Sequence, residues 1–296
     1  MGFLEMILSR SLTSARGWMS LVPRSLQWLH QFLSSEVGVG DNVNGFKRYV
    51  ILGYWSLVII VSFPLTIKLC NWIARDDILR KRRIVIARKF FHLVAIILFA
   101  PITWVDPDLM ALSYAVATAL LMILEIIRCH SFVKDQHKAP SSLNAFYDIF
   151  LDEKDSLAGD GGLAITHIAL IVGCAMPLWV SQIVSFHENN SIIEYVGVIV
   201  LGIGDSAGAI AGILFGRHPW PGGSRRTSEG SLCMFVSMLV PLYLIGVDNL
   251  NKIGPVLTIV TILEASTSQI DNLCLPLAGI SLVALLAAGD ASSGML

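Results

Sequence analysis

The chain has 296 residues; 54% are apolar, only 15% are charged, and the formal net charge is −1. Soluble domains carry about 25% charged residues, so this composition excludes an ordinary soluble domain. Five cysteines without a CxxC pair argue against a disulfide framework or a cysteine zinc site. We expect no nucleic-acid partner, and the oligomeric state is left open.

Several apolar runs approach or exceed the roughly 20 residues that cross a bilayer. Only helices and closed barrels satisfy their backbone polar groups in lipid, so we predict an all-α, polytopic transmembrane helix bundle of about seven or eight spans. Residues 1–48 are expected to be an interfacial and linker segment, with amphipathic helices broken at Pro23 and a polar, glycine-rich linker over 34–44.

The predicted transmembrane domain covers residues 49–288, and 289–296 form a tail. Its expected spans are 49–69, 93–104, 109–127, 162–184, 195–215, 231–247, 253–275 and 277–288. Pro276 is expected to break the chain between the last two, because proline interrupts a helix.

The charges of the loops predict how these spans are oriented. Basic residues gather in the loops on one side, at 70–92, 128–161 and 216–230. The loops on the other side, at 105–108, 185–194 and 248–252, carry only Lys252. By the positive-inside rule the first set is cytosolic, although Lys47 and Arg48 do not fit this pattern.

The stretch from Gly202 to Gly230 combines unusual features. Asp205 lies inside an apolar segment, and an acid within a membrane is costly enough to be a functional candidate. Glycines recur every four residues, at 204, 208, 212 and 216, which predicts a stripe for close helix packing. Packing alone does not explain Asp205, which could hold a metal or a hydroxyl group.

The next loop, GRHPWPGGSRRTSEG (216–230), suits an anion. Its glycines allow a close backbone approach, and Arg225 and Arg226 offer fixed cations to phosphate oxygens. Thr227, Ser228 or Ser231 could cap the next helix. The simpler interpretation is a positively charged loop of turn residues.

Other polar clusters lie in the loops and helix ends of the same side. RKFFH (88–92) is either an interfacial anchor or a site segment, in which His92 could orient a phosphate or a carboxylate. Clustered carboxylates suit a hard divalent cation, Mg²⁺ or Ca²⁺. The candidates are Asp205, Asp152, Glu153, Asp155, Glu264 and Asp271.

Several of these segments occur in the order seen in a known family. RKFFH, FLDEKDS (150–156), GIGDSAGAIAGILFG…WPGGSRRTSEGS (202–231) and LEASTSQIDNLCLPL (263–277) resemble the C-terminal half of dolichol kinases. Members of that family are usually much longer, with further N-terminal spans that are absent here or reduced to residues 1–69. The family usually has lysines where this chain has Arg225 and Arg226.

The resemblance implies a kinase of the endoplasmic reticulum membrane with a cytosolic active face. It would transfer the γ-phosphoryl group of CTP to dolichol, giving dolichyl phosphate for glycosylation. Arg88, Lys89 and Asp205 match positions important for activity in related kinases. The CTP site would fall on 216–231, and its candidate residues are Gly216, Trp220, Gly222, Gly223, Arg225, Arg226, Thr227, Glu229 and Gly230.

Three alternatives stay open at this point. The acceptor could be another lipid alcohol, such as phytol, farnesol or diacylglycerol. The enzyme could be a cytidylyltransferase that uses CTP on a lipid phosphate. The intramembrane acids could instead form the ion relay of a transporter.

Overall fold

The computed structural model describes residues 23–39, 42–73, 80–134, 165–183, 192–221, 226–244, 247, 250–267 and 271–293. By their contacts the residues divide into two units, 1–57 and 58–296, and each unit is described by itself.

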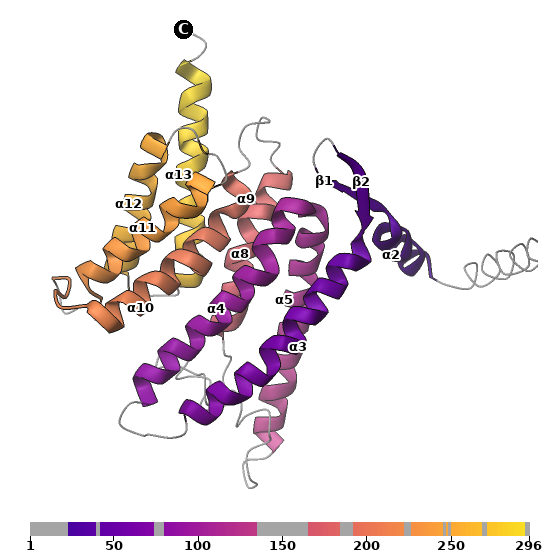
Figure 1. Ribbon diagram of the computed structural model, residues 1–296, viewed down its shortest axis with the longest axis horizontal. Helices are drawn as coiled ribbons and strands as arrows, with labels where there is room; N and C mark the ends of the chain where they lie inside the picture. The colour runs from indigo at the N-terminus through magenta and orange to yellow at the C-terminus, as the bar shows by residue number, and fades with distance from the viewer. Residues whose placement is uncertain are drawn as a thin grey trace, which may run out of the picture. The chain divides into compact units, whose positions relative to one another are not determined.

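The described residues of the first unit form a helix, a hairpin and the start of a second helix (Figure 1). Helix α2 (Arg24–Ser34) begins directly after Pro23, where the helix break was predicted. Strands β1 (Glu36–Val39) and β2 (Asn42–Lys47) pair antiparallel, with Val37 opposite Phe46. The segment predicted as a linker over 34–44 thus contains strand residues, and the fold is not purely α-helical. The two strands are polar and contain glycine, but Val37 is buried and pairs with Phe46 across the ribbon.

Helix α3 (Arg48–Ile73) shows the surface expected of a membrane span. In the part that belongs to the second unit, Ile60 is 68% exposed and Phe63 is 66% exposed. The end of the helix, in contrast, packs against α4 (Arg80–Val105), where Ile73 and Ala87 are buried. Apolar side chains exposed along a long helix are suited to lipid rather than to water.

The rest of the second unit is a bundle of packed helices (Figure 1). After α4 come α5 (Pro107–Lys134), α8 (Ile165–Ile183), α9 (Ile192–Gly197), the π-helical segment η2 (Val198–Gly204), α10 (Asp205–Phe215), α11 (Ser228–Leu244), α12 (Leu250–Ser266) and α13 (Asp271–Ser293). Asp106 separates α4 from α5, and its carboxylate accepts a hydrogen bond from the Leu109 amide at 3.1 Å. It therefore caps α5.

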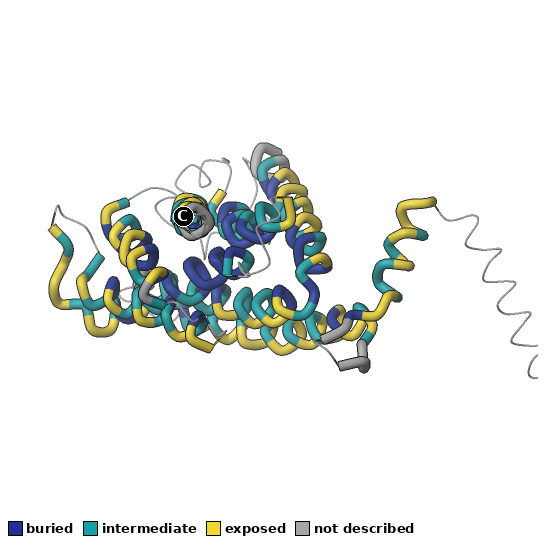
Figure 2. Tube along the Cα trace, turned by 90° about the horizontal axis from the view of Figure 1, so that it is seen from above, coloured by how far each residue is buried: buried dark blue, intermediate teal, exposed yellow. Residues whose placement is uncertain are grey.

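The centre of the bundle is the continuous segment formed by α9, η2 and α10. Ile193 and Leu201 are fully buried, and η2 contacts α4, α8, α11 and α13 as well as its neighbours in the chain. Figure 2 shows buried positions gathered inside the bundle and exposed positions along its outer sides. An apolar crevice lies between this segment and α11–α13. Its volume of about 20 Å³ is too small for a ligand.

Five helical segments are long and apolar enough to cross a membrane: 48–73, 83–105, 107–129, 165–183 and 192–215. The apolar parts of α11 and α13, Ser228–Leu244 and Asn272–Leu286, are shorter. Within the described ranges the chain is thus a polytopic helical membrane protein. The prediction of seven or eight spans is not confirmed by the five found among the described residues.

One predicted break was misplaced. Pro276 lies inside α13, and the gap between the last two helices falls after Thr267 instead. Proline cannot donate a hydrogen bond to the Asn272 carbonyl, one turn earlier. That carbonyl packs against Gly173 of α8, where a side chain would collide with it. The proline is accommodated because a neighbouring helix approaches at the point of the missing bond.

Candidate functional site

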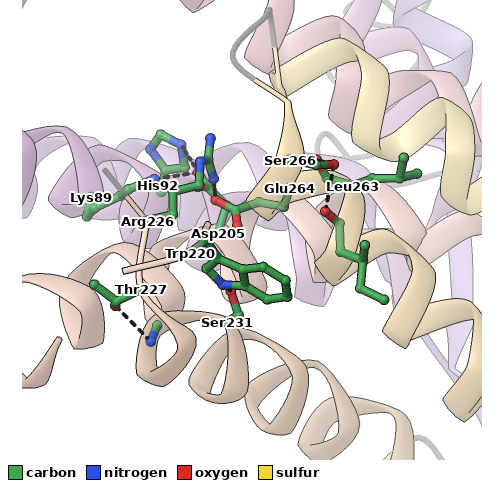
Figure 3. Close-up of polar contacts among 12 residues, drawn as sticks. Lys89, His92, Asp205, Trp220, Arg226, Thr227, Ser231, Leu263, Glu264 and Ser266 are labelled. Atoms are coloured by element: carbon green, nitrogen blue, oxygen red, sulfur yellow. Dashed lines mark hydrogen bonds and ion pairs between the residues drawn. The ribbon is translucent and has the colours of Figure 1, made fainter. Parts of the chain in front are cut away.

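Two helices distant in the sequence bring a cation and an acid into contact. Lys89 of α4 donates a hydrogen bond to Oδ2 of Asp205, the first residue of α10 (Figure 3). His92, one turn after Lys89, places its Nε2 3.6 Å from the same carboxylate oxygen. The three side chains are only 8% to 13% exposed. Asp205 therefore faces a polar cluster inside the bundle and not lipid.

The backbone before Asp205 determines which way it points. The Asp205 amide bonds to the Val200 carbonyl, five residues earlier, which closes the last turn of η2. Such π-helical turns are rare and often occur at functional sites, because the extra residue rotates the rest of the helix about its axis. Gly202 of η2 faces α4, where a side chain in its place would collide with Ile96. The close contact of η2 with α4 brings Asp205 within reach of Lys89.

The glycine stripe of the same segment faces a different helix. Side chains at Gly204 and Gly208 would press on Met238 and Met234 of α11, and Gly208 also lies against the carbonyl of Gly230. Gly212 lies against Thr227. The prediction of close helix packing for this stripe is confirmed. It forms the α10–α11 contact.

The loop between α10 and α11 folds back on itself. Pro219 pairs with Thr227, the Trp220 amide donates to the Arg226 carbonyl at 3.0 Å, and the Trp220 indole donates to Ser231 Oγ at 3.0 Å. Thr227 caps α11, because its hydroxyl oxygen accepts the Gly230 amide at 3.3 Å. Of the three capping residues considered, the described bond thus favours Thr227.

Arg226 extends the cluster toward α12. Its guanidinium pairs with the carboxylate of Glu264, and the two side chains are 24% and 12% exposed (Figure 3). The charge of Arg226 also acts on Asp205. Two cations and two carboxylates therefore lie within one cluster, drawn from α4, α10, α12 and the loop.

Glu229, in the first turn of α11, bonds back to the start of the loop. His218 Nδ1 lies 2.6 Å from its carboxylate, and the His218 amide donates to it at 3.3 Å. The hydrogen bond from His218, supported by backbone N–H groups, lowers the pKa of Glu229 to about 2. An open cavity of about 450 Å³ lies here, lined by residues 214–218 and Glu229. Its volume falls in the range of small-molecule pockets.

The chain is similar to proteins of one kind. Human dolichol kinase is 32% identical over 267 residues, 85% of this chain and 46% of the relative. Dolichol kinase EVAN of Arabidopsis thaliana is 28% identical over 298 residues, 96% and 48% respectively, and dolichol kinase sec59 of Schizosaccharomyces pombe is 29% identical over 214 residues, 68% and 38%. The resemblance to dolichol kinases is confirmed. No protein-family model and no solved structure matches the chain.

This similarity covers most of the chain but less than half of each of these relatives, at 46%, 48% and 38% of their lengths. Of the residues that the dolichol kinase resemblance singled out, the structure brings Lys89, Asp205 and Arg226 together. Arg88 contributes its carbonyl oxygen, which bonds to His92 Nδ1 at 2.9 Å. Gly216 and Gly230 serve the close packing of α10, the loop and α11. Gly222, Gly223 and Arg225 lie outside the described residues.

The metal prediction remains untested. Asp152, Glu153 and Asp155 lie outside the described residues, and of Asp271 only the backbone is described. Among the described residues, no three histidine, cysteine or acidic side chains gather to hold an ion. Asp205 and Glu264 are each engaged by a cation, so as arranged these two do not fit a divalent-cation site.

Sequence reasoning missed one buried ion pair. Glu125 and Arg128 of α5 are 3% and 2% exposed and share two hydrogen bonds, at 2.8 and 2.7 Å. The signal was available, because Glu125 is an acid inside a predicted span, like Asp205. Its position near the end of the span concealed it among the loop charges.

Proposed function

We propose that this chain is the phosphoryl-transferring part of a dolichol kinase and that it uses CTP as the donor. The observation that carries this proposal is the convergence of Lys89, Asp205 and Arg226, from three segments far apart in sequence, in a chain similar to dolichol kinases. The names of these relatives state a kinase that acts on dolichol, a lipid alcohol. The reaction implied is transfer of a phosphoryl group to the hydroxyl group of dolichol.

The cluster has the charges that phosphoryl transfer requires. The reaction depends mainly on alignment and on neutralising negative charge around the transferred group. Lys89 and Arg226 supply fixed cations, and each is held by a carboxylate. An arriving triphosphate would meet two cations that these carboxylates already hold in place.

The nucleotide would bind on 216–231. In support, this loop is folded into a paired turn that opens beside the 450 Å³ cavity, and Arg226 connects it to the Asp205 cluster. The choice of CTP over other triphosphates rests on the resemblance of this loop to the family segment. Asp205 would keep Lys89 and His92 in place as the negative centre of the site.

The divalent cation remains part of the proposal as a companion of the triphosphate. Magnesium is commonly held by one or two carboxylates together with substrate phosphates. Because the described carboxylates are engaged by Lys89 and Arg226, no step is assigned to the ion here.

The lipid would approach from the membrane. Apolar side chains exposed on α10, including Ile210 at 39% and Leu214 at 62%, offer an apolar surface to an isoprenoid chain. We place the protein in the endoplasmic reticulum membrane with this site on the cytosolic side, because the basic loops, the 216–231 loop and the starts of α4 and α11 lie on one side of the predicted topology. Its product would serve glycosylation.

The decisive experiment uses the purified chain with CTP labelled in the γ-phosphate and, in parallel, in the cytidine. Acceptors are dolichol, phytol, farnesol, diacylglycerol and a lipid phosphate in separate reactions. Phosphate label on dolichol with no cytidine label is the expected result. Cytidine label on a lipid phosphate would establish the cytidylyltransferase instead, and label on another alcohol would change the substrate. Ion flux without CTP binding would indicate a transporter.

A further inference from the structure

The imidazole of His92 lies in the candidate site with one nitrogen bonded and the other left over. Nδ1 is 2.9 Å from the Arg88 carbonyl oxygen. Nε2 is buried, and among the described residues no hydrogen-bond partner reaches it. Asp205 Oδ2 is 3.6 Å away, which is too far for a hydrogen bond. Buried polar atoms are normally satisfied, so this nitrogen requires an explanation.

The bond at Nδ1 determines what Nε2 can do. A carbonyl oxygen only accepts, so Nδ1 must carry the proton, and in a neutral imidazole the other nitrogen is then an acceptor. In the neutral ring, Nε2 therefore directs a lone pair toward the Asp205 carboxylate, which is also an acceptor. A group that bonds to Nε2 must therefore donate. A hydroxyl group can do so, and its single proton serves Nε2 alone, because Lys89 already bonds to the carboxylate.

On the basis of the proposed function, we propose that Nε2 of His92 receives first the hydrogen bond and then the proton of the lipid hydroxyl. In the transfer, the lipid oxygen forms a bond to the γ-phosphorus while the bond from that phosphorus to the bridging oxygen breaks. The electron pair of the broken bond leaves with the nucleoside diphosphate. The hydroxyl proton passes to Nε2, and Asp205 faces the resulting imidazolium.

Lys89 would provide the room for the hydroxyl. It occupies the same carboxylate oxygen that faces Nε2, and its side chain is 10% exposed. Lysine is a flexible point cation that serves phosphate well. A small shift of its ammonium toward the triphosphate would open space beside Nε2. The nucleotide would therefore prepare the place for the alcohol.

Two substitutions separate the two nitrogens of the ring. In His92→Gln the side-chain amide can reach the position of Nε2, whereas in His92→Asn it reaches only that of Nδ1. We expect both variants to be slower than the unmodified chain, because an amide cannot take the proton. His92→Gln should still retain at least about tenfold more dolichol phosphorylation than His92→Asn, because only the first keeps an acceptor for the hydroxyl. Equal activities of the two variants, or greater activity of His92→Asn, would overturn the proposal.

Binding of labelled CTP, with equal affinity expected in both variants, is the control for folding.

A second measurement needs no variant. A dolichol analogue with fluorine in place of the hydroxyl cannot donate, and on the unmodified chain it should compete with dolichol roughly tenfold more weakly than a short-chain dolichol does. Equal competition would refute the role of His92. If the unmodified chain transfers no phosphate to dolichol, the proposed function fails instead, which is a distinct result.

Discussion

Helix α10 packs against α11 on one side and against α4 on the other, and the two contacts use opposite chemistry. Toward α11, Gly208 and Gly212 let the backbones approach until a single methyl group would be in contact. Toward α4, Asp205 meets Lys89 and His92. The first contact stabilises the bundle without carrying charge. The second buries charge at an energetic cost that packing would not require.

Neighbouring residues of one motif therefore serve separate purposes. Gly204 and Asp205 are adjacent, yet successive residues of a helix point about 100° apart. The glycine is directed to α11 and the acid to α4. Substitutions on the α11 side should therefore change stability, and substitutions on the α4 side should change activity.

The largest effect is expected at Asp205. Asp205→Asn should lower CTP-dependent phosphorylation of dolichol at least about 100-fold, because Lys89 and His92 lose the charge that orients them. The measurement is the initial rate with labelled CTP, together with the elution profile of the purified protein.

Removal of one partner also leaves a largely buried cation uncompensated, which is destabilising. The double variant Lys89→Met/Asp205→Asn controls for this, since the pair is then neutral. It should regain the thermal stability of the unmodified chain and stay inactive. An active double variant would show that the charges on the α4 side only hold the helices together.

On the other side of α10, Gly230→Ala should destabilise the protein by about 1–3 kcal/mol. Its added methyl group would lie 2.8 Å from the Gly208 carbonyl oxygen and 3.3 Å from Gly212 Cα, and neither backbone can yield easily. The thermal unfolding midpoint in detergent is the measurement, with activity per folded molecule as the second readout.

Gly254→Ala is the matched control, because nothing lies within 4 Å of its added methyl group. It should leave the midpoint unchanged or raise it, since alanine favours a helix more than glycine does. If Gly230→Ala kept full stability but lost activity, the two sides of α10 would not be separable in the way proposed.

Much of the α11 side could be predicted from sequence, and much of the α4 side could not. Spacing alone places Gly204, Gly208 and Gly212 on one stripe. The partner of Asp205 is different, because Lys89 lies 116 positions away and no local pattern names it. The charge of each was evident, but their contact depends on how η2 turns the chain.

The π-helical segment itself was also beyond prediction. Val198–Gly204 has the composition of an ordinary apolar helix, so its sequence gives no sign of a π-helical turn. The segment packs against four other helices that lie far from it in the sequence or follow it. The partner of Arg226 was missed for a similar reason. Glu264 was a candidate from its depth in a span, but only the tertiary structure brings the loop onto α12.

A smaller effect is expected at Glu264. Glu264→Gln should raise the KM for CTP about threefold to tenfold, with kcat changed less, because Arg226 loses the carboxylate that orients it. Ser266→Ala is the control, since within the described part of the chain Ser266 bonds only to carbonyl groups of its own helix. A lower KM would mean that Glu264 competes with the nucleotide for Arg226.

The smallest effect concerns Glu229, which lies on neither side of α10. Because its pKa is lowered to about 2, from 4.5, the stabilisation it contributes is complete above about pH 4.5 and is lost only as pH falls through the lower value. His218 can donate through Nδ1 whether the ring is charged or neutral. Between about pH 5 and 8 the carboxylate therefore does not change its protonation state.

The pH profile of the activity of Glu229→Gln should run parallel to that of the unmodified chain over this range, displaced by a small constant factor. A profile that changed shape would show that the loop, as well as the Asp205 cluster, contributes a group that titrates during the reaction.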